Sequence, residues 1–149
     1  MYYYLFALIS GAALTTQIGI NGKLVSTMES PVLTSFISFL VGTIALAVIY
    51  IVAVCYGVQP VPAFNAITQT NFWMWLGGLF GAFYILTTIL CAPKIGFANM
   101  FSLVVTGQII LAVIFDHFGV LGNSVHVLSS FRAFGVVLLI ISVYLIQTN

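Results

Sequence analysis

Amide and hydroxyl side chains recur inside otherwise apolar stretches of this 149-residue chain. Gln17 and Asn21 are four residues apart, so a helix would place them on one face, with Ser10 two turns before Gln17. A second polar group includes Thr106 and Gln108. Both glutamines fall in the middle of their apolar stretches, where polar side chains are costly unless they are paired or face water. We therefore predict that these five residues bind a small solute.

The same amides have a second interpretation, in which they only join helices to one another. An interhelical hydrogen bond of this kind contributes about 0.6 to 2 kcal/mol within a membrane. The shared depth of Gln17 and Gln108 favours a central cavity, because two amides at one depth exceed what helix adhesion requires. The sequence leaves both interpretations open.

Asp116 is the only carboxylate attached directly to an apolar stretch, and Arg132 begins the next stretch on the same side. A hairpin between the two stretches would bring the carboxylate and the guanidinium together. The sequence therefore predicts an ion pair that braces or gates one end of the protein. The alternative is that Asp116 carries a coupling proton or sodium ion.

Other reactive residue types lack the spacing that chemistry requires. His117 and His126 are nine residues apart, and Cys55 and Cys91 lie in apolar runs without the paired spacing of a metal site or redox motif. No nucleophile stands near a base, and no glycine-rich phosphate loop follows a strand. We therefore expect no catalysis, no metal ion and no cofactor.

The composition indicates the class of protein that carries these residues. Hydrophobic residues make up 62% of the chain and charged residues 3%, and the mean hydropathy is +1.25, whereas soluble proteins have about 25% charged residues. The chain is therefore predicted to be an integral membrane protein with the lipid bilayer as its surroundings. Its net charge of +1 offers no basic surface for nucleic acid.

The apolar stretches repeat at lengths close to the ~20 residues that cross a bilayer as a helix. They predict an all-α membrane protein with a single transmembrane domain over residues 1–149. The five expected spans cover about residues 3–21, 32–56, 72–91, 97–116 and 131–147.

Local signals set the expected ends of these spans. Gly22 and Lys23 should end the first span, and Ser30 followed by Pro31 should open the second, as a cap and a first-turn proline. A turn over residues 93–96 should separate the third and fourth spans, and loops are expected over residues 57–71 and 117–130.

Charges and aromatic residues bear on the orientation of the chain. Tyrosine and tryptophan residues at the ends of the first three spans all fall on one side, which agrees with their preference for the headgroup zone. Lys23 and Lys94 fall on the opposite side, and Arg132 falls on the aromatic side. Because the positive residues that normally fix orientation are nearly balanced, we expect the chain to insert both ways round.

Small residues within the spans indicate where helices approach closely. Small residues in the second span form a stripe along one helical face, which consists of Pro31, Ser35, Ser38, Gly42 and Ala45. The third span has a repeated small-x-x-x-small pattern, and such patterns mark either a packing surface or a hinge. The candidates for these roles are Gly42, Gly77, Gly78, Gly81 and Gly107.

Several short motifs, in order along nearly the whole chain, resemble the five-helix YdcZ-like branch of the drug/metabolite transporter superfamily. They are Gln17-x-x-x-Asn21-Gly22, Gly42-Thr43, Trp75-x-Gly77-Gly78-x-x-Gly81-Ala82, Pro93-x-x-Gly96, Gly107-Gln108, Asp116-His117-Phe118-Gly119 and Arg132-x-x-Gly135. The resemblance implies a multi-pass protein of the bacterial inner membrane. Larger members of the superfamily carry two inverted five-helix repeats around a central site. An antiparallel homodimer of this chain would reproduce that arrangement.

These features together lead to a hypothesis about function. We expect a transporter of small solutes that works by alternating access, with a second, inverted copy of the chain as its partner. Distant relatives, the small multidrug-resistance proteins, have a glutamate in the first helix, whereas this chain offers Gln17 and Asn21. The resemblance and the amides therefore favour a neutral or zwitterionic substrate. The alternative is a structural or accessory membrane protein that transports nothing.

Overall fold

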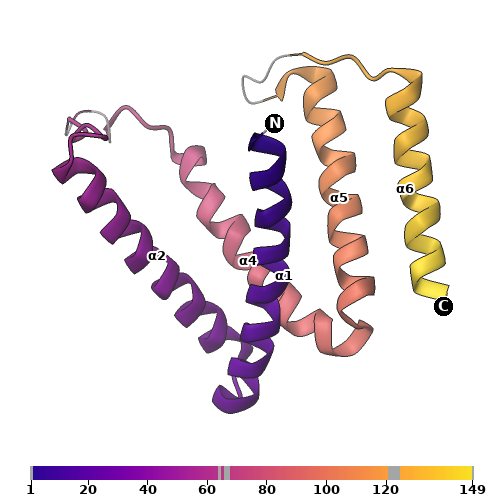
Figure 1. Ribbon diagram of the computed structural model, residues 1–149, viewed down its shortest axis with the longest axis horizontal. Helices are drawn as coiled ribbons and strands as arrows, with labels where there is room; N and C mark the ends of the chain where they lie inside the picture. The colour runs from indigo at the N-terminus through magenta and orange to yellow at the C-terminus, as the bar shows by residue number, and fades with distance from the viewer. Residues whose placement is uncertain (1, 64, 66–67, 121–124, 149) are drawn as a thin grey trace. The chain divides into compact units, whose positions relative to one another are not determined.

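The computed structural model describes residues 2–63, 65, 68–120 and 125–148, and every long element in it is a helix. The helices are α1 (Tyr2–Met28), α2 (Pro31–Cys55), the 3-10 helix η1 (Phe72–Trp75), α4 (Leu76–Ile95), α5 (Phe97–Phe118) and α6 (Ser130–Thr148) (Figure 1). Five helical segments are long and apolar enough to cross a membrane, η1 and α4 counting as one. The predicted all-α architecture with five such helices is therefore confirmed over the described residues.

The helix α1 continues beyond the point where the sequence was expected to end it. The helix does not stop at Gly22 and Lys23, where the first span was expected to end, but runs on to Met28. A single glycine costs about 1 kcal/mol in a helix relative to alanine, which a long helix tolerates. The chain turns instead at Glu29, which adopts a left-handed φ of 54° while its N–H donates to Val25 O at 2.9 Å.

The helix α2 begins as the sequence predicts. Ser30 is the N-cap residue, its Oγ accepts a hydrogen bond from Leu33 N at 3.2 Å, and Pro31 occupies the first turn. The cap satisfies one of the free amides at the helix start, and proline lacks an N–H that would need a partner there. The connection between α1 and α2 is consequently only two residues long.

Two further boundaries differ from the expected ones. Pro93 lies inside α4, which continues to Ile95, so the turn expected over residues 93–96 is confined to Gly96 with its φ of 83°. Likewise α5 includes His117 and ends at Phe118, so the last loop begins at Gly119. Gly119 has a φ of 60°, so it and Gly96 both adopt a positive φ at which a side chain would be strained. Parts of the expected loops, residues 64, 66–67 and 121–124, lie outside the described residues.

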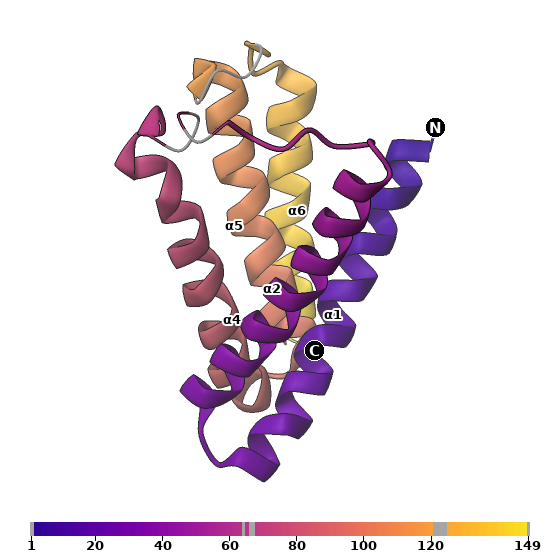
Figure 2. The same ribbon diagram turned by 90° about the vertical axis from the view of Figure 1, so that its left-hand side faces the viewer.

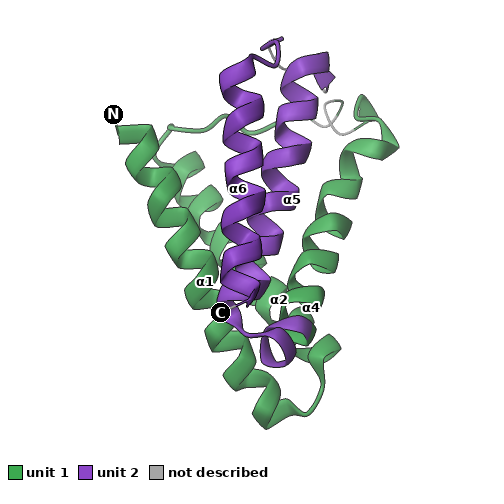
Figure 3. Ribbon diagram, turned by 90° about the vertical axis from the view of Figure 1, so that its right-hand side faces the viewer, with its two compact units in different colours: residues 1–90 green, residues 91–149 purple. Residues whose placement is uncertain are grey.

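The chain forms two compact units, residues 1–90 and residues 91–149, which Figure 3 colours separately. In the first unit, α1 and α2 contact one another and diverge from their short connection (Figures 1 and 2). Ile18 and Asn21 of α1, and Thr34 and Ser35 of α2, are buried in the half of each helix nearest the connection. In the second unit, α5 and α6 pack as a hairpin.

Candidate functional site

Three polar side chains meet between α1 and α2. Gln17 Nε2 and Asn21 Nδ2 each donate a hydrogen bond to Ser38 Oγ, both at 3.2 Å. Asn21 is 3% exposed, and Gln17 and Ser38 are half-buried. The spacing of four residues in α1 places both amides on the face toward α2, which is why one hydroxyl oxygen can accept from both.

A groove of about 530 Å³ runs along this cluster on the surface of α1 and α2. Its polar lining consists of Thr16, Gln17, Asn21 and Ser38, and its other walls are apolar or glycine: Ala13, Ile20, Leu24, Ile37, Val41 and Gly42. No charged side chain is among these lining residues. Both helices that line the groove are long and apolar enough to span a membrane.

Ser38 differs from the other hydroxyl groups around it. Ser10 Oγ donates to Phe6 O at 2.9 Å, Thr16 Oγ1 donates to Ala12 O at 2.9 Å and Ser35 Oγ donates to Pro31 O at 2.8 Å. Such bonds to the preceding turn of the same helix are usual for serine and threonine in helices. Ser38 Oγ instead lies toward α1 and accepts two bonds.

The sequence pattern placed Ser38 only in a stripe of small residues and missed this polar role. The available signal was its spacing from Thr34, one helical turn earlier on the same face of α2. Thr34 is fully buried, and its Oγ1 has no hydrogen-bond partner among the described residues. The hydroxyl groups of Thr34 and Ser38, one turn apart on α2, mark a polar face.

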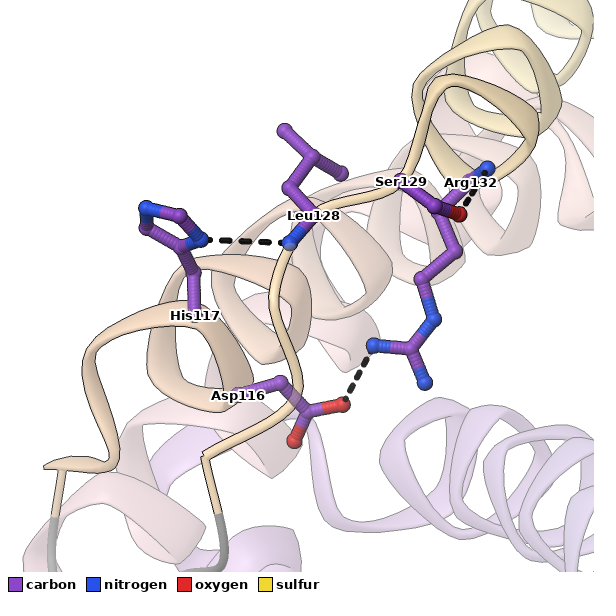
Figure 4. Close-up of polar contacts among 5 residues, drawn as sticks. All are labelled: Asp116, His117, Leu128, Ser129 and Arg132. Atoms are coloured by element: carbon purple, nitrogen blue, oxygen red, sulfur yellow. Dashed lines mark hydrogen bonds and ion pairs between the residues drawn. The ribbon is translucent and has the colours of Figure 1, made fainter.

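The second unit contains the pair that the sequence associated with bracing or gating. Arg132 Nη1 lies 3.3 Å from Asp116 Oδ2, and the two side chains are 43% and 36% exposed (Figure 4). The structure therefore brings these two residues together. At that exposure an ion pair contributes about 0 to 1 kcal/mol, so it adds little to stability.

Three further bonds lie near this pair, among residues 116–117 and 126–132. His126 N donates to Asp116 O at 2.8 Å, Leu128 N donates to His117 Nδ1 at 3.2 Å, and Arg132 N donates to Ser129 Oγ at 3.3 Å. Figure 4 shows the last two bonds flanking the ion pair. The side chain of His117 therefore accepts a hydrogen bond from the backbone of the residues that lead into α6.

The remaining predicted substrate residues are Ser10 in the first unit and Thr106 and Gln108 in the second. Ser10 is exposed and donates within α1. In the second unit, Thr106 Oγ1 donates to Ser102 O at 2.7 Å, and Gln108 is exposed. A cavity shared by Gln17 and Gln108 stays a prediction.

One predicted glycine makes a close contact. A Cβ at Gly81 of α4 would lie 3.2 Å from Cζ of Phe39, whose ring lies against the helix backbone there. A Cβ at the other candidates, Gly42, Gly77, Gly78 and Gly107, would meet no atom within 4 Å. Gly81 therefore has a packing contact that these four glycines lack.

The described part of the chain contains no cluster of side chains that could bind a metal ion. No three side chains of His, Cys, Asp or Glu come together there in an arrangement that could hold a metal ion. Cys55 and Cys91 are free thiols.

The family described as "Putative inner membrane exporter, YdcZ" matches residues 2–145. Neither the curated proteins nor the solved structures gave a match.

Proposed function

This chain belongs to the YdcZ family, and on that premise we propose that it moves small solutes across the membrane as an antiparallel homodimer. Its family and its five long apolar helices make it a multi-pass protein of the bacterial inner membrane. The family is one of membrane exporters and not of enzymes, so we take export as the direction of transport.

The observation that carries the proposal is the polar cluster in the α1–α2 groove. Gln17, Asn21 and Ser38 place two amides and a hydroxyl within apolar helices, beside a groove of about 530 Å³. Polar side chains facing lipid are unfavourable, because hydrocarbon offers them no hydrogen-bond partner. This groove is therefore best explained if it faces a polar solute or water.

The balance of positive charge between the two sides and the number of helices both support the antiparallel arrangement. Lys23 and Lys94 fall on one side of the membrane and Arg132 on the other, which leaves orientation weakly specified. Five spans form half of an inverted repeat, and a second copy turned over in the membrane completes it. On this proposal the whole chain, residues 1–149, acts as one transmembrane domain.

Alternating access then follows from symmetry. Two identical inverted subunits that exchange conformations convert an inward-open dimer into an outward-open one of equal free energy. In this scheme Gln17, Asn21 and Gln108 contact the solute, and Ser10 and Thr106 line its path. The ion pair of Asp116 and Arg132 braces or gates one end, and Gly77 and Gly78 permit α4 to bend.

The proposed substrate is neutral or zwitterionic. No charged side chain lines the α1–α2 groove, so a net charge there would lack a compensating partner. Amide groups accept and donate hydrogen bonds equally well, which suits an uncharged polar solute.

Transport by purified protein in proteoliposomes tests the proposal. We expect efflux of at least one solute from a panel of radiolabelled neutral metabolites, and a reduced rate for Gln17→Ala and Gln108→Ala at equal protein content. Ser142→Ala serves as the control, because that exposed hydroxyl donates to Leu138 O within α6 and has no role in the proposal. Unchanged transport by both glutamine variants would remove them from the site.

The same hydrogen bonds also favour a second candidate function. Because Gln17 and Asn21 join α1 to Ser38 of α2, the cluster alone would serve a structural or accessory protein that transports nothing. Absence of efflux for every solute in proteoliposomes that contain folded protein would select this alternative.

A further inference from the structure

We propose that Ser38 is the centre of a binding site for one uncharged hydroxyl group, carried by a solute with a compact apolar body. The site lies in the α1–α2 groove, with the carbonyl oxygens of Gln17 and Asn21 completing it. As a statement about the substrate of the transporter, this inference rests on the proposed function.

The hydroxyl group of Ser38 has a hydrogen bond to give after both of its amide contacts are made. A serine hydroxyl has two acceptor lone pairs and one donor proton. Gln17 Nε2 and Asn21 Nδ2 occupy both lone pairs. The proton must point away from these two donors, and no described atom accepts it. Ser38 therefore keeps one donor at the surface of the groove.

The two amides also carry hydrogen-bonding groups that Ser38 does not use. Each amide uses one N–H on Ser38, and its carbonyl oxygen lies at the other end of the planar group. Neither Gln17 Oε1 nor Asn21 Oδ1 accepts a hydrogen bond from a described residue. Two carbonyl acceptors and three donors, the Ser38 O–H and the second N–H of each amide, are consequently left uncommitted around a single hydroxyl oxygen.

This pattern selects the chemistry of the ligand. A ligand hydroxyl accepts a hydrogen bond from Ser38 with its oxygen and donates one to an amide carbonyl with its proton. One hydroxyl group therefore provides both the acceptor and the donor that the site needs. An ammonium group cannot accept, and a carboxylate cannot donate. Either charge would also enter a groove whose lining contains no opposite charge.

The walls of the groove define the rest of the ligand. Ile20, Leu24, Ile37 and Val41 surround the polar cluster with apolar surface. The volume of about 530 Å³ is in the range of roughly 300 to 1,000 Å³ found for small-molecule sites. A ring or short branched chain carrying one hydroxyl fits this combination.

Matched ligands test the inference on the purified, full-length protein. Cyclohexanol, cyclohexylammonium and cyclohexanecarboxylate share one apolar body and differ in the head group. Binding is measured as the saturable rise in thermal unfolding temperature during titration of each compound. We expect cyclohexanol to bind and the two charged compounds to bind at least tenfold more weakly. Equal or tighter binding of either charged compound would overturn the inference, and this comparison needs no variant.

Variants then locate the site. Ser38→Ala should weaken cyclohexanol binding about threefold to tenfold, the loss expected for one neutral hydrogen bond, and Ser38→Thr should retain binding because it keeps the hydroxyl. Ser35→Ala is the matched control, since that hydroxyl is already committed to Pro31 O. Cyclohexanol that partitions into detergent does so equally for all variants. Wild-type affinity in Ser38→Ala would overturn the inference.

The two proposals fail separately. Efflux of a neutral metabolite by a protein whose Ser38→Ala variant binds cyclohexanol normally would overturn this inference and leave the proposed function in place. Cyclohexanol binding that depends on Ser38, without efflux of any metabolite, would support the site and overturn the proposed function.

Discussion

The ring of Phe39 on α2 lies so close to Gly81 on α4 that a Cβ at Gly81 would approach its Cζ to 3.2 Å. This separation is tighter than an ordinary van der Waals contact, so the ring must move by a few tenths of an ångström if residue 81 gains a side chain. Phe39 therefore limits the size of the side chain that α4 can carry at position 81. It gives Gly81 a structural reason that Gly77 and Gly78 lack.

Alanine substitutions at two glycines of α4 should therefore differ in effect. Gly78→Ala should stabilise the protein by up to about 1 kcal/mol, because alanine favours helix and its Cβ meets open space. Gly81→Ala should be less favourable by about 1 kcal/mol because it crowds Phe39. Denaturant unfolding in detergent measures both. In a double-mutant cycle, Phe39→Ala should abolish the difference, and a difference that persists would contradict the contact.

Thr34 offers a test of a buried polar group. Its hydroxyl is fully buried without a partner, so Thr34→Val, which keeps the shape and removes the hydroxyl, should stabilise the protein by about 1 kcal/mol or more. Thr88→Val is the matched control, because Thr88 is buried but donates to Ile85 O at 2.8 Å, so its loss should be neutral or destabilising. Thermal unfolding distinguishes them. Destabilisation by Thr34→Val would mean that the hydroxyl has a polar partner in the membrane.

The pair of Asp116 and Arg132 should contribute little to stability. Because both side chains are over one-third exposed, Asp116→Asn and Arg132→Gln should each lower the free energy of unfolding by less than about 1 kcal/mol, and added salt should shrink the effect. Efflux in proteoliposomes is the separate readout for gating. A fall in transport of tenfold with unchanged stability would support the gate, and unchanged transport would limit the pair to bracing.

Glu29 adopts a backbone conformation that favours glycine. With its φ of 54°, Glu29→Gly should stabilise the connection between α1 and α2 by about 1 kcal/mol. Glu29→Gln removes the charge and keeps the strained backbone, so it separates the two contributions. If Glu29→Gln stabilises as much as Glu29→Gly, charge and not backbone strain is responsible. Thermal unfolding of the two variants side by side gives the comparison.

The sequence allowed the class of fold to be predicted, but not how its polar groups are arranged. Hydropathy locates the five apolar helices, and Ser30 with Pro31 marks the start of α2, because both signals are local. The continuation of α1 to Met28 was missed, since neither a glycine nor a lysine stops a helix by itself.

The candidate site was predicted only in part for the same physical reason. Gln17 and Asn21 share a face by their spacing alone, and the sequence indicated that much. The role of Ser38 depends on the register between α1 and α2, which brings its hydroxyl within 3.2 Å of both amides. Register between helices arises from packing, and spacing along one helix does not encode it.

The most direct test of the account concerns the orientation of the chain in the membrane. The native cysteines are first removed by Cys55→Ala and Cys91→Ala. A single cysteine is then introduced by Val58→Cys, in the exposed segment after α2, or by Thr27→Cys, at the end of α1 where it connects to α2. A membrane-impermeant maleimide is then applied to intact spheroplasts and again after permeabilisation. The antiparallel homodimer predicts that about half of the copies of each variant react before permeabilisation and the rest afterwards. Complete labelling of one variant with none of the other would show a single orientation and contradict the proposed dimer.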